Sequence, residues 1–516
     1  MARADRRRIE VKGTLRAVTP LLVGGTREPG LDVVPLRDGA GRLVVPASSL
    51  TGVLRHHATR HLRADAMTIA QLFGTSDVGA SRLVVRELRA TGTPSQTLRD
   101  GVGIDRRHGV AAENVKFDRV QLDAGTDFEL FVSYDTAAKA DDEDPAKALF
   151  DQLVDDLLRG ELRVGAGTTR GQGRVHLVDA MRRTIDLCDA QSVLAVLGGG
   201  SHTWERIEAP EQAPSRGLTV VIEWRAVTPV ISAVRVNDGA VDHAPMVLAR
   251  VGDGTTRAAL HMVLPGTSIK GVMRSEVERM VRTLCDEDAP EGFLEQLAHP
   301  LVVALFGGVD RRSALWVDDV LSEPVLTGVD EAGLLDDWHA MLAARGDDST
   351  RLKRLRDALD LRRQGLPGVL IPTSHVAVDR WTGGPVDGAL YSVLEPHGIG
   401  WEPMVLRVDV DAVDPNLGTE AALALLVLVL DAVTAGEVGF GFGTHRGLGS
   451  VAVDRLSSSS DREDRVVAAV VTALNSYKAG VRLLDTLDDH LRSDLAEALT
   501  GAVDRHRISL AEGRAS

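Results

Sequence analysis

Two glycine-rich blocks carry residue types that suit anion binding. Residues 165–173 (GAGTTRGQG) and 441–449 (GFGTHRGLG) each combine four glycines with one arginine. Glycine permits left-handed turns and close backbone approach, so N–H groups can face a phosphate while Arg170 and Arg446 add positive charge. The spacing matches neither a Walker A loop nor the GxGxxG fingerprint, so no nucleotide cofactor is indicated. The alternative role is a glycine turn that closes a sheet.

The overall charge argues against a general nucleic-acid binder. The 516 residues carry a formal net charge of −15, whereas proteins that bind nucleic acid usually present a basic surface to the phosphates. Any RNA site on this chain must therefore be local. At 44% hydrophobic content the chain can fill two or three domain cores.

The remaining composition favours a cytoplasmic protein. Cys188 and Cys285 lie far apart without a CxxC partner, so neither a disulfide framework nor a zinc site is indicated. The basic start, residues 1–8, runs directly into an alternating segment and lacks the apolar region of a signal peptide. The longest apolar run, residues 421–430, is about half of the roughly 20 residues that a membrane helix needs. We expect a buried helix there and no contact with a membrane.

The chain contains an internal repeat. The pentapeptide RAVTP occurs at residues 16–20 and again at 225–229, each time after an alternating apolar segment that predicts a strand. Four further pairs of similar blocks follow in the same order: 46–55 with 265–274, 72–74 with 305–307, 103–106 with 377–380, and the two glycine-rich blocks. Collinear blocks indicate a tandem duplication.

Spacing and composition predict the boundaries of the two copies. We expect a first module at residues 1–180, a linker at 181–217 with prolines and glycine near its end, and a second module at 218–456. The second copy is longer between its blocks, and leucines at helical spacing predict a helical insertion at about 322–366. Residues 457–516, after a run of serines, are expected to form a helical tail.

Within each copy the pattern predicts strand, helix, several strands, helix and strand. Ser48 or Ser49 can cap the first helix of copy one, and Thr267 or Ser268 the matching helix of copy two. The second helices are expected to begin at Pro145 and at Thr419. This order indicates an α+β fold of two tandem ferredoxin-like (RRM-like, βαββαβ) modules with inserted hairpins and a C-terminal helical tail.

Together these blocks resemble the RAMP superfamily of CRISPR-associated proteins, in particular the repeated backbone subunit of type III (Csm/Cmr) effector complexes. The resemblance covers nearly all of copy one. Copy two departs from the pattern, since Val234 and Arg235 replace Gly24 and Gly25. The resemblance implies that the chain binds a CRISPR guide RNA and target RNA and assembles with other type III effector subunits.

The resemblance also implies which residues contact RNA. The helix starts and the glycine-rich loops would contact the guide backbone, because helix N-termini attract phosphates. The segment around the Asp–Arg pairs resembles the family's thumb, a hairpin that wedges between bases of the guide–target duplex. The implied RNA-binding residues are Ser48, Ser49, Arg55, Arg106, Lys116, Gly167, Arg170, Gly171, Ser268, Lys270, Arg274, Arg380, Gly443, Arg446 and Gly447.

In family members that cut target RNA, an aspartate before the first helix carries the activity together with a divalent metal ion. The matching residues are Asp32 and Asp242, which would also hold Mg²⁺ or another divalent cation. An ionised carboxylate there could help to activate the ribose 2′-hydroxyl for attack on phosphorus. His243, beside Asp242, is more simply read as a solvated loop residue.

Two function hypotheses remain open at this point. The first is a metal-dependent endoribonuclease that cuts guide-bound target RNA, and if only one module cuts, we expect it to be the first. The second is a non-catalytic RNA-binding scaffold of the same kind of complex, which the acidic balance and the altered second copy favour. A third and weaker idea is that the insertion and the tail dock other effector proteins.

Overall fold

Each copy of the repeat builds an antiparallel sheet with the same strand order. The first sheet contains β1 (Asp5–Ala17), β3 (Leu83–Val85), β7 (Asp127–Ala137), β8 (Val175–Asp186) and β9 (Glu205–Arg206), and the second contains β10 (Leu218–Ala226), β15 (Leu315–Val317), β19 (Met404–Val408) and β20 (Val451–Ser460). In this computed structural model the orders are β3-β7-β1-β8-β9 and β15-β19-β10-β20. Apart from β9, both are the order of a ferredoxin-like βαββαβ sheet, so the predicted α+β fold is confirmed.

The structure describes residues 5–25, 31–92, 94–137, 144–197, 203–209, 217–251, 257–343 and 348–515. By their contacts these residues form two compact units. The first unit comprises residues 1–103, 113–168 and 172–213, and the second comprises 104–112, 169–171 and 214–516. Two short segments of the first copy, a hairpin tip and part of a glycine-rich loop, therefore belong to the second unit.

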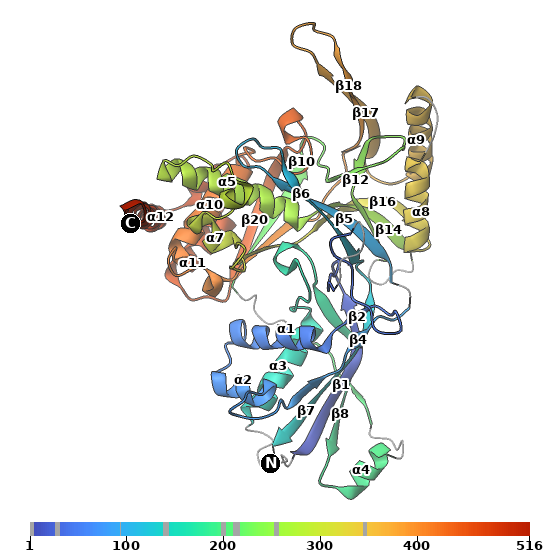
Figure 1. Ribbon diagram of the computed structural model, residues 1–516, viewed down its shortest axis with the longest axis vertical. Coiled ribbons are helices and arrows are strands. Elements are labelled where there is room, and N and C mark those ends of the chain that lie inside the picture. The colour runs from blue at the N-terminus through green and yellow to red at the C-terminus, as the bar shows by residue number, and fades with distance from the viewer. Residues whose placement is uncertain are drawn as a thin grey trace. The chain divides into compact units, whose positions relative to one another are not determined.

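Three helices cover one face of the first sheet (Figure 1): α1 (Ala47–Arg60), α2 (Ala66–Phe73) and α3 (Pro145–Arg159). The α3 helix begins at the predicted residue because the Asp144 carboxylate accepts a hydrogen bond from the N–H of Ala146, and Pro145 suits the first helical position. It ends where Gly160 takes the left-handed conformation. Short elements complete this unit: β2 (Val44–Val45), β4 (Leu88–Arg89) and α4 (Ala190–Leu197).

The matching helices of the second unit are α5 (Gly266–Cys285) and α10 (Thr419–Thr434). The apolar run 421–430 lies in α10, where every side chain but Leu428 is fully buried, so the predicted buried helix is confirmed. Two short helices, α6 (Phe293–Gln296) and α7 (Pro300–Phe306), follow α5. None of the helices in the described ranges has the length and apolar composition needed to span a bilayer.

The C-terminal helices are part of the second unit's core. This segment contains α11 (Arg465–Asn475), a 3₁₀ turn at Leu483–Thr486 and α12 (Asp489–Ala515). Val467 and Leu483 have no exposed surface, and they belong to the same buried cluster as the strands and helices α5 and α10. The tail therefore completes this core instead of lying apart from it.

Each copy also contains a long hairpin. The first is β5 (Gln96–Ile104) with β6 (Ala111–Leu122), and the second is β17 (Val369–Val378) with β18 (Pro385–His397). In the second unit the β17–β18 hairpin extends away from the sheet (Figure 1) and pairs at its base with β12 (His243–Pro245), which pairs in turn with β11 (Ala233–Arg235). A further sheet contains β13 (Val247–Val251), β14 (Ala258–Leu264) and β16 (Val320–Gly328).

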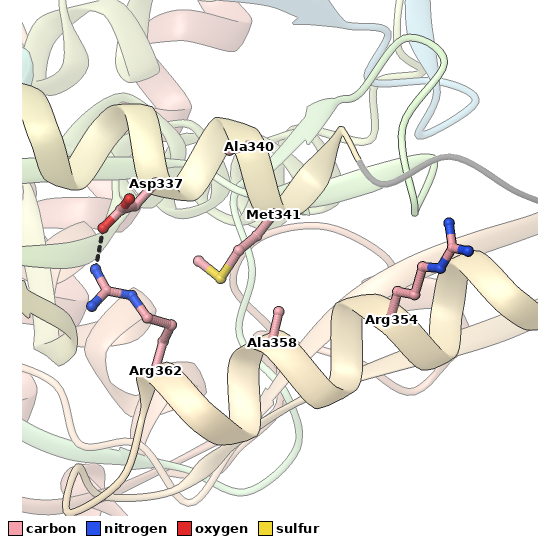
Figure 2. A pocket seen from close by; sticks show the side chains of 6 residues that line it. All are labelled: Asp337, Ala340, Met341, Arg354, Ala358 and Arg362. Atoms are coloured by element: carbon pink, nitrogen blue, oxygen red, sulfur yellow. Dashed lines mark hydrogen bonds and ion pairs between the residues drawn. The ribbon is translucent and has the colours of Figure 1, made fainter.

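Two helices stand in the predicted insertion: α8 (Glu331–Leu342) and α9 (Asp348–Arg362). They pack on the β13–β14–β16 sheet through a small core of their own, which includes Trp338 and Leu355. An open hollow of about 370 Å³ lies between them (Figure 2), and an ion pair between Asp337 and Arg362 crosses it. Apart from this pair its lining is Ala340, Met341, Arg354 and Ala358.

Three local predictions were wrong. The serines and threonines at the starts of α1 and α5 are not caps: Pro46 and Pro265 occupy the cap positions, and neither helix has a side-chain cap hydrogen bond. Residues 181–186 of the expected linker are part of β8, which pairs with β1, and residues 210–216 lie outside the described residues. The serine run 457–460 is no break, because it extends β20 along β10.

Candidate functional site

The two candidate aspartates make the same backbone contact in both copies. The Asp32 Oδ2 atom accepts a hydrogen bond from the N–H of Asp118 at 3.0 Å, and the Asp32 N–H donates to the Asp118 carbonyl at 3.1 Å. Asp242 repeats this pairing with Ser392 of β18, at 2.7 Å and 3.1 Å. The duplication has therefore preserved the placement of each aspartate against its hairpin.

The equivalence extends to the neighbouring residues. Asp118 and Ser392 lie equally far along the chain from the Asp–Arg pairs of their copies. The residue after each aspartate forms a parallel bridge to the hairpin, Val33 to Arg119 and His243 to Val393. Long-range register thus holds both loops in the same position.

The two carboxylates differ in exposure and in the number of hydrogen bonds. Asp32 is exposed. Asp242 is half-buried, and its Oδ2 atom also accepts a hydrogen bond from the Ser392 hydroxyl at 2.9 Å. Burial raises the pKa of Asp242, but hydrogen bonds from the Ser392 amide and hydroxyl outweigh it, and the net pKa is lowered. Asp242 is therefore ionised at neutral pH.

His243 is not a solvated loop residue. Its ring stacks on Phe442 at a centroid distance of 5.1 Å and meets Tyr391 edge-on at 6.0 Å. The Arg446 guanidinium lies over the Phe442 ring at 4.8 Å and also hydrogen-bonds the Tyr391 hydroxyl. Burial lowers the pKa of His243, so the imidazole is neutral at pH 7. The second copy thus has an aromatic and cationic cluster that includes Arg446, and sequence reasoning missed it.

The glycine-rich loops close on the repeated RAVTP segments. In the first copy Ala166 donates its N–H to the Leu22 carbonyl at 2.7 Å, and Gly173 donates to the Pro20 carbonyl at 2.8 Å. The second copy repeats both bonds, from Phe442 to Ile231 and from Gly449 to Pro229. These bonds support the sheet-closing role.

The glycines of these loops need their conformational freedom. The predicted RNA-binding glycines all have positive φ: Gly167 at +71°, Gly171 at +89°, Gly443 at +74° and Gly447 at +84°. An L-residue is strained in this region. Gly443 and Gly447 flank the 3₁₀ turn Thr444–Arg446, whose arginine is exposed.

The start of α1 presents the predicted polar residues to solvent. Ser48 and Arg55 are exposed, and Ser49 is half-buried. No side chain caps this helix at Pro46. Backbone N–H groups of its first turn can therefore donate hydrogen bonds to a phosphate oxygen.

The start of α5 already has an acidic partner. The N–H of Gly266 donates to the Asp319 carboxylate at 2.7 Å, close to the half-buried Ser268. A negative charge at a helix N-terminus is stabilising, but it also repels a second anion. The two copies therefore differ at the position where the resemblance places guide RNA.

Lys270 and Arg274 also face inward. The Lys270 ammonium is buried and donates to the Ser313 hydroxyl and the Leu315 carbonyl, each at 2.7 Å. Burial, reinforced by nearby arginines, lowers the pKa of Lys270 well below its usual value. Arg274 donates to the carbonyls of Gly307 and Leu297 at 2.8 and 2.6 Å. Both side chains hold local structure together.

The two Asp–Arg pairs form matching turns at their hairpin tips. The Asp105 carboxylate accepts hydrogen bonds from the N–H groups of Arg107 and His108. Asp379 does the same for Trp381 and Thr382. The aspartate of this motif thus shapes the tip.

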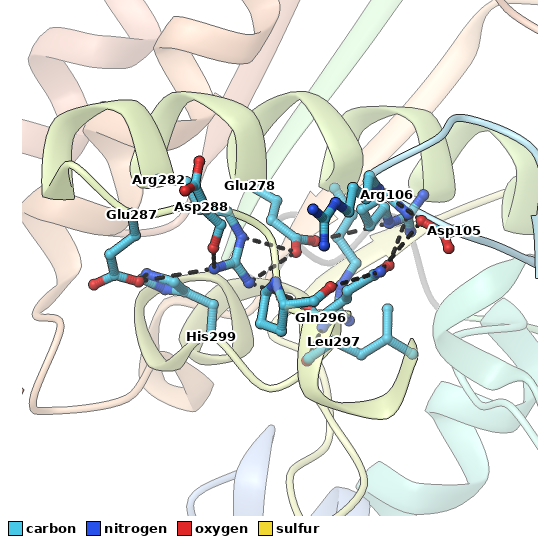
Figure 3. A network of polar contacts seen from close by, with 12 residues as sticks. Asp105, Arg106, Glu278, Arg282, Glu287, Asp288, Gln296, Leu297 and His299 are labelled. Atoms are coloured by element: carbon cyan, nitrogen blue, oxygen red, sulfur yellow. Dashed lines mark hydrogen bonds and ion pairs between the residues drawn. The ribbon is translucent and has the colours of Figure 1, made fainter. Parts of the chain in front are cut away.

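The arginine that follows differs between the two turns. Arg106 is mostly buried: its Nε atom lies 3.7 Å from the Glu278 carboxylate, and its N–H donates to the Gln296 side chain at 2.7 Å (Figure 3). Arg380 is exposed, and the neighbouring Trp381 is 98% exposed. The tip of the second hairpin is therefore the one that offers both charge and an aromatic face.

The other predicted cations lie on the surface or near it. Lys116 is exposed on β6 and pairs with Asp100 at 3.1 Å, and this hydrogen bond raises the pKa of Lys116. Arg170 is half-buried. These positions are compatible with RNA contact, and the RNA-binding residues stay predictions.

A divalent cation has few protein ligands at either aspartate. Among the described residues, no group of three or more acidic, histidine or cysteine ligands surrounds Asp32 or Asp242. Mg²⁺ commonly retains several waters and takes one or two carboxylates together with substrate phosphates. One carboxylate per copy fits an ion that is held jointly with bound RNA.

Comparison with models of protein families identifies two matching regions in this chain. The sequence model of the RAMP superfamily matches residues 14–176 and 251–452, which together are more than half of the chain. The first region contains Asp32, whereas Asp242 lies just before the second. No curated protein matches the chain significantly.

Proposed function

Because this chain belongs to the RAMP superfamily, we propose that it binds CRISPR guide RNA as a backbone subunit of a type III effector complex and that its two modules fill adjacent positions. Family membership itself supports a CRISPR-associated role in a complex with RNA and other subunits. The tandem sheets with identical strand order support the two-position proposal, since one chain then supplies two equivalent units.

We further propose that the chain cuts complementary target RNA in antiviral defence. The supporting observation is the repeated pairing of Asp32 with Asp118 and of Asp242 with Ser392, which holds a carboxylate in the same place in each copy. In the proposed reaction each carboxylate helps to remove the proton from a ribose 2′-hydroxyl, and bound RNA places that oxygen in line with the phosphorus. The 2′-oxygen bonds to the phosphorus as the bond to the 5′-oxygen of the next nucleotide breaks, and that 5′-oxygen takes up a proton. In each module a separate divalent cation, held by Asp32 or by Asp242 together with the RNA, would neutralise charge on the scissile phosphate.

The first module is the stronger candidate for cleavage. Asp32 is exposed and accepts one protein hydrogen bond in the described structure, so its carboxylate can approach RNA. In the second module Ser392 donates twice to Asp242, and Asp319 carries negative charge at the start of α5. These features favour the alternative of a non-cleaving scaffold for the second module.

Guide binding is tested by purifying the chain from cells that express a CRISPR array and sequencing the RNA that remains bound. We expect guides that carry repeat-derived sequence. RNA without any repeat-derived sequence would overturn the proposal.

Substitution of Ser392 by alanine should change the pH dependence of the cut that Asp242 of the second module would make. The Ser392 hydroxyl lowers the pKa of Asp242, so its removal raises that pKa toward the ordinary value. A carboxylate that acts as a base loses activity as the pH falls through its pKa, so the acid limb of the rate profile should move to higher pH. Ser374→Ala, at an exposed position on β17, is the control. An unchanged acid limb in Ser392→Ala would contradict this role for Asp242.

A further inference from the structure

Four potential metal ligands converge at the end of α5, outside the residues discussed above. Cys285 is the last residue of α5, Glu287 follows it, His299 precedes α7, and His506 lies on α12. Their ligand atoms, one per residue, all lie within 4.8 Å of one another. All four residues belong to the second unit.

His299 has no hydrogen-bond partner for either ring nitrogen among the described residues. The residue is 4% exposed, and both nitrogens are buried. Its Nε2 atom lies 3.5 Å from a Glu287 oxygen, and its ring centroid lies 4.7 Å from that of His506. Leaving a buried polar group without a partner is costly, so this arrangement points to a missing ligand.

The charges around the cluster agree with a missing cation. The other Glu287 oxygen lies 2.9 Å from His506 Nε2. Arg282, which lies 3.7 Å from Glu287, is already engaged by Glu278 at 3.2 Å (Figure 3). The buried His299 ring nitrogens make no hydrogen bond among the described residues, so a ring lone pair can be donated to a metal.

We propose that Cys285, Glu287, His299 and His506 form a structural Zn²⁺ site. One thiolate, two imidazoles and one carboxylate are a tetrahedral ligand set that suits Zn²⁺ and does not suit Mg²⁺ or Ca²⁺. Zinc–ligand bonds of about 2.0–2.3 Å place tetrahedral ligand atoms roughly 3.3–3.8 Å apart. The four ligand atoms here lie within 4.8 Å of one another, so small side-chain movements complete the site. A thiolate and a carboxylate together neutralise the ion.

The site would fasten the C-terminal helix to the rest of the second unit. His506 is the only one of the four ligands from α12, and the other three come from the end of α5 and the segment up to α7. With four protein ligands the coordination is closed, so its role is stability and not catalysis. It is separate from Asp32 and Asp242, and it does not depend on the proposed function.

The experiment strips the full chain of metal and then dialyses it against Zn²⁺ alone. We expect about one Zn²⁺ per chain by elemental analysis, together with a higher melting temperature, because a ligand of the folded state stabilises it. The Cys285→Ser variant should bind Zn²⁺ at least about 10–100-fold more weakly. That is the loss in affinity when a group that only hydrogen-bonds a metal ligand is removed, and Cys285 is a direct ligand. Cys188→Ser, which changes the exposed free cysteine, should bind as the unchanged chain does.

Cobalt substitution gives a readout that does not depend on a variant folding. Co²⁺ bound to the unchanged chain should show tetrahedral visible absorption and a thiolate-to-metal charge-transfer band. The band should be absent from Cys285→Ser, and His299→Gln should alter the visible absorption. The proposal is overturned if the unchanged chain binds neither Zn²⁺ nor Co²⁺. It is also overturned if both Cys285→Ser and His299→Gln bind the metal as the unchanged chain does.

Discussion

Replacing Asp32 with alanine is expected to slow one of two target-RNA cuts by about 10²–10⁴-fold, the usual contribution of a positioned acid–base group. Guide binding should be unchanged, since Asp32 is exposed and its only described side-chain hydrogen bond is to the Asp118 amide. The measurement is single-turnover cleavage of a labelled complementary RNA by the assembled complex, with the products separated by length. Asp242→Ala should affect only the other cut.

Two further variants separate catalysis from structure. Asp32→Asn keeps the shape and one hydrogen-bond acceptor but removes the charge, so it should slow the same cut as the alanine variant. Asp77→Ala changes an exposed loop aspartate of the same copy and should leave both cuts unchanged. If both cuts persist at full rate in Asp32→Ala and Asp242→Ala, these aspartates do not carry the activity and the catalytic assignment is overturned.

The second large effect is expected on stability. Leu483→Ala removes a leucine with no exposed surface from the 3₁₀ turn between α11 and α12. Loss of a buried leucine costs about 2–5 kcal/mol, so the free energy of unfolding of the second unit should fall by that amount. Denaturant titration followed by circular dichroism measures it.

Val481 offers a matched control two residues away. Its side chain is 45% exposed, and substitutions at such positions usually stay within about 0.5 kcal/mol. If Leu483→Ala leaves the unfolding midpoint at that of Val481→Ala, the C-terminal helices do not belong to the core.

The same burial affects any test of whether the C-terminal tail docks other effector proteins. Deleting the chain beyond Leu456 would not isolate such docking, because it also removes the end of β20 and buried side chains of the core.

Local signals predicted the regular elements well. The α3 and α10 helices begin at the predicted residues: Asp144 caps α3, and Glu420 places a negative charge in the first turn of α10. At α1 and α5 the serines and threonines resemble helix caps, but they follow the proline that occupies the cap position. The serines at residues 457–460 predict a break because serine is common in loops, but pairing with β10 outweighs that preference.

The site was only partly predictable. The block pattern located Asp32 and Asp242, but the contact between Asp242 and Ser392 joins residues far apart in sequence and depends on strand register. The packing of His243 on Phe442 depends on the same tertiary contacts. Cys285 and His506 are separated by most of the second copy, so a search for closely spaced ligands could not find their cluster.

The burial of α12 has a consequence for how the protein is made. Leu499 and Val503, near the end of the chain, complete the core to which the first strand of the second sheet also belongs. During synthesis the second unit cannot close its core until Val503 has left the ribosome. The main body of the first unit uses only residues up to 213 and can fold well before that. Nascent chains therefore pass through a stage in which a folded N-terminal half carries an unfinished C-terminal half, and at that stage chaperone binding would protect the exposed apolar strands.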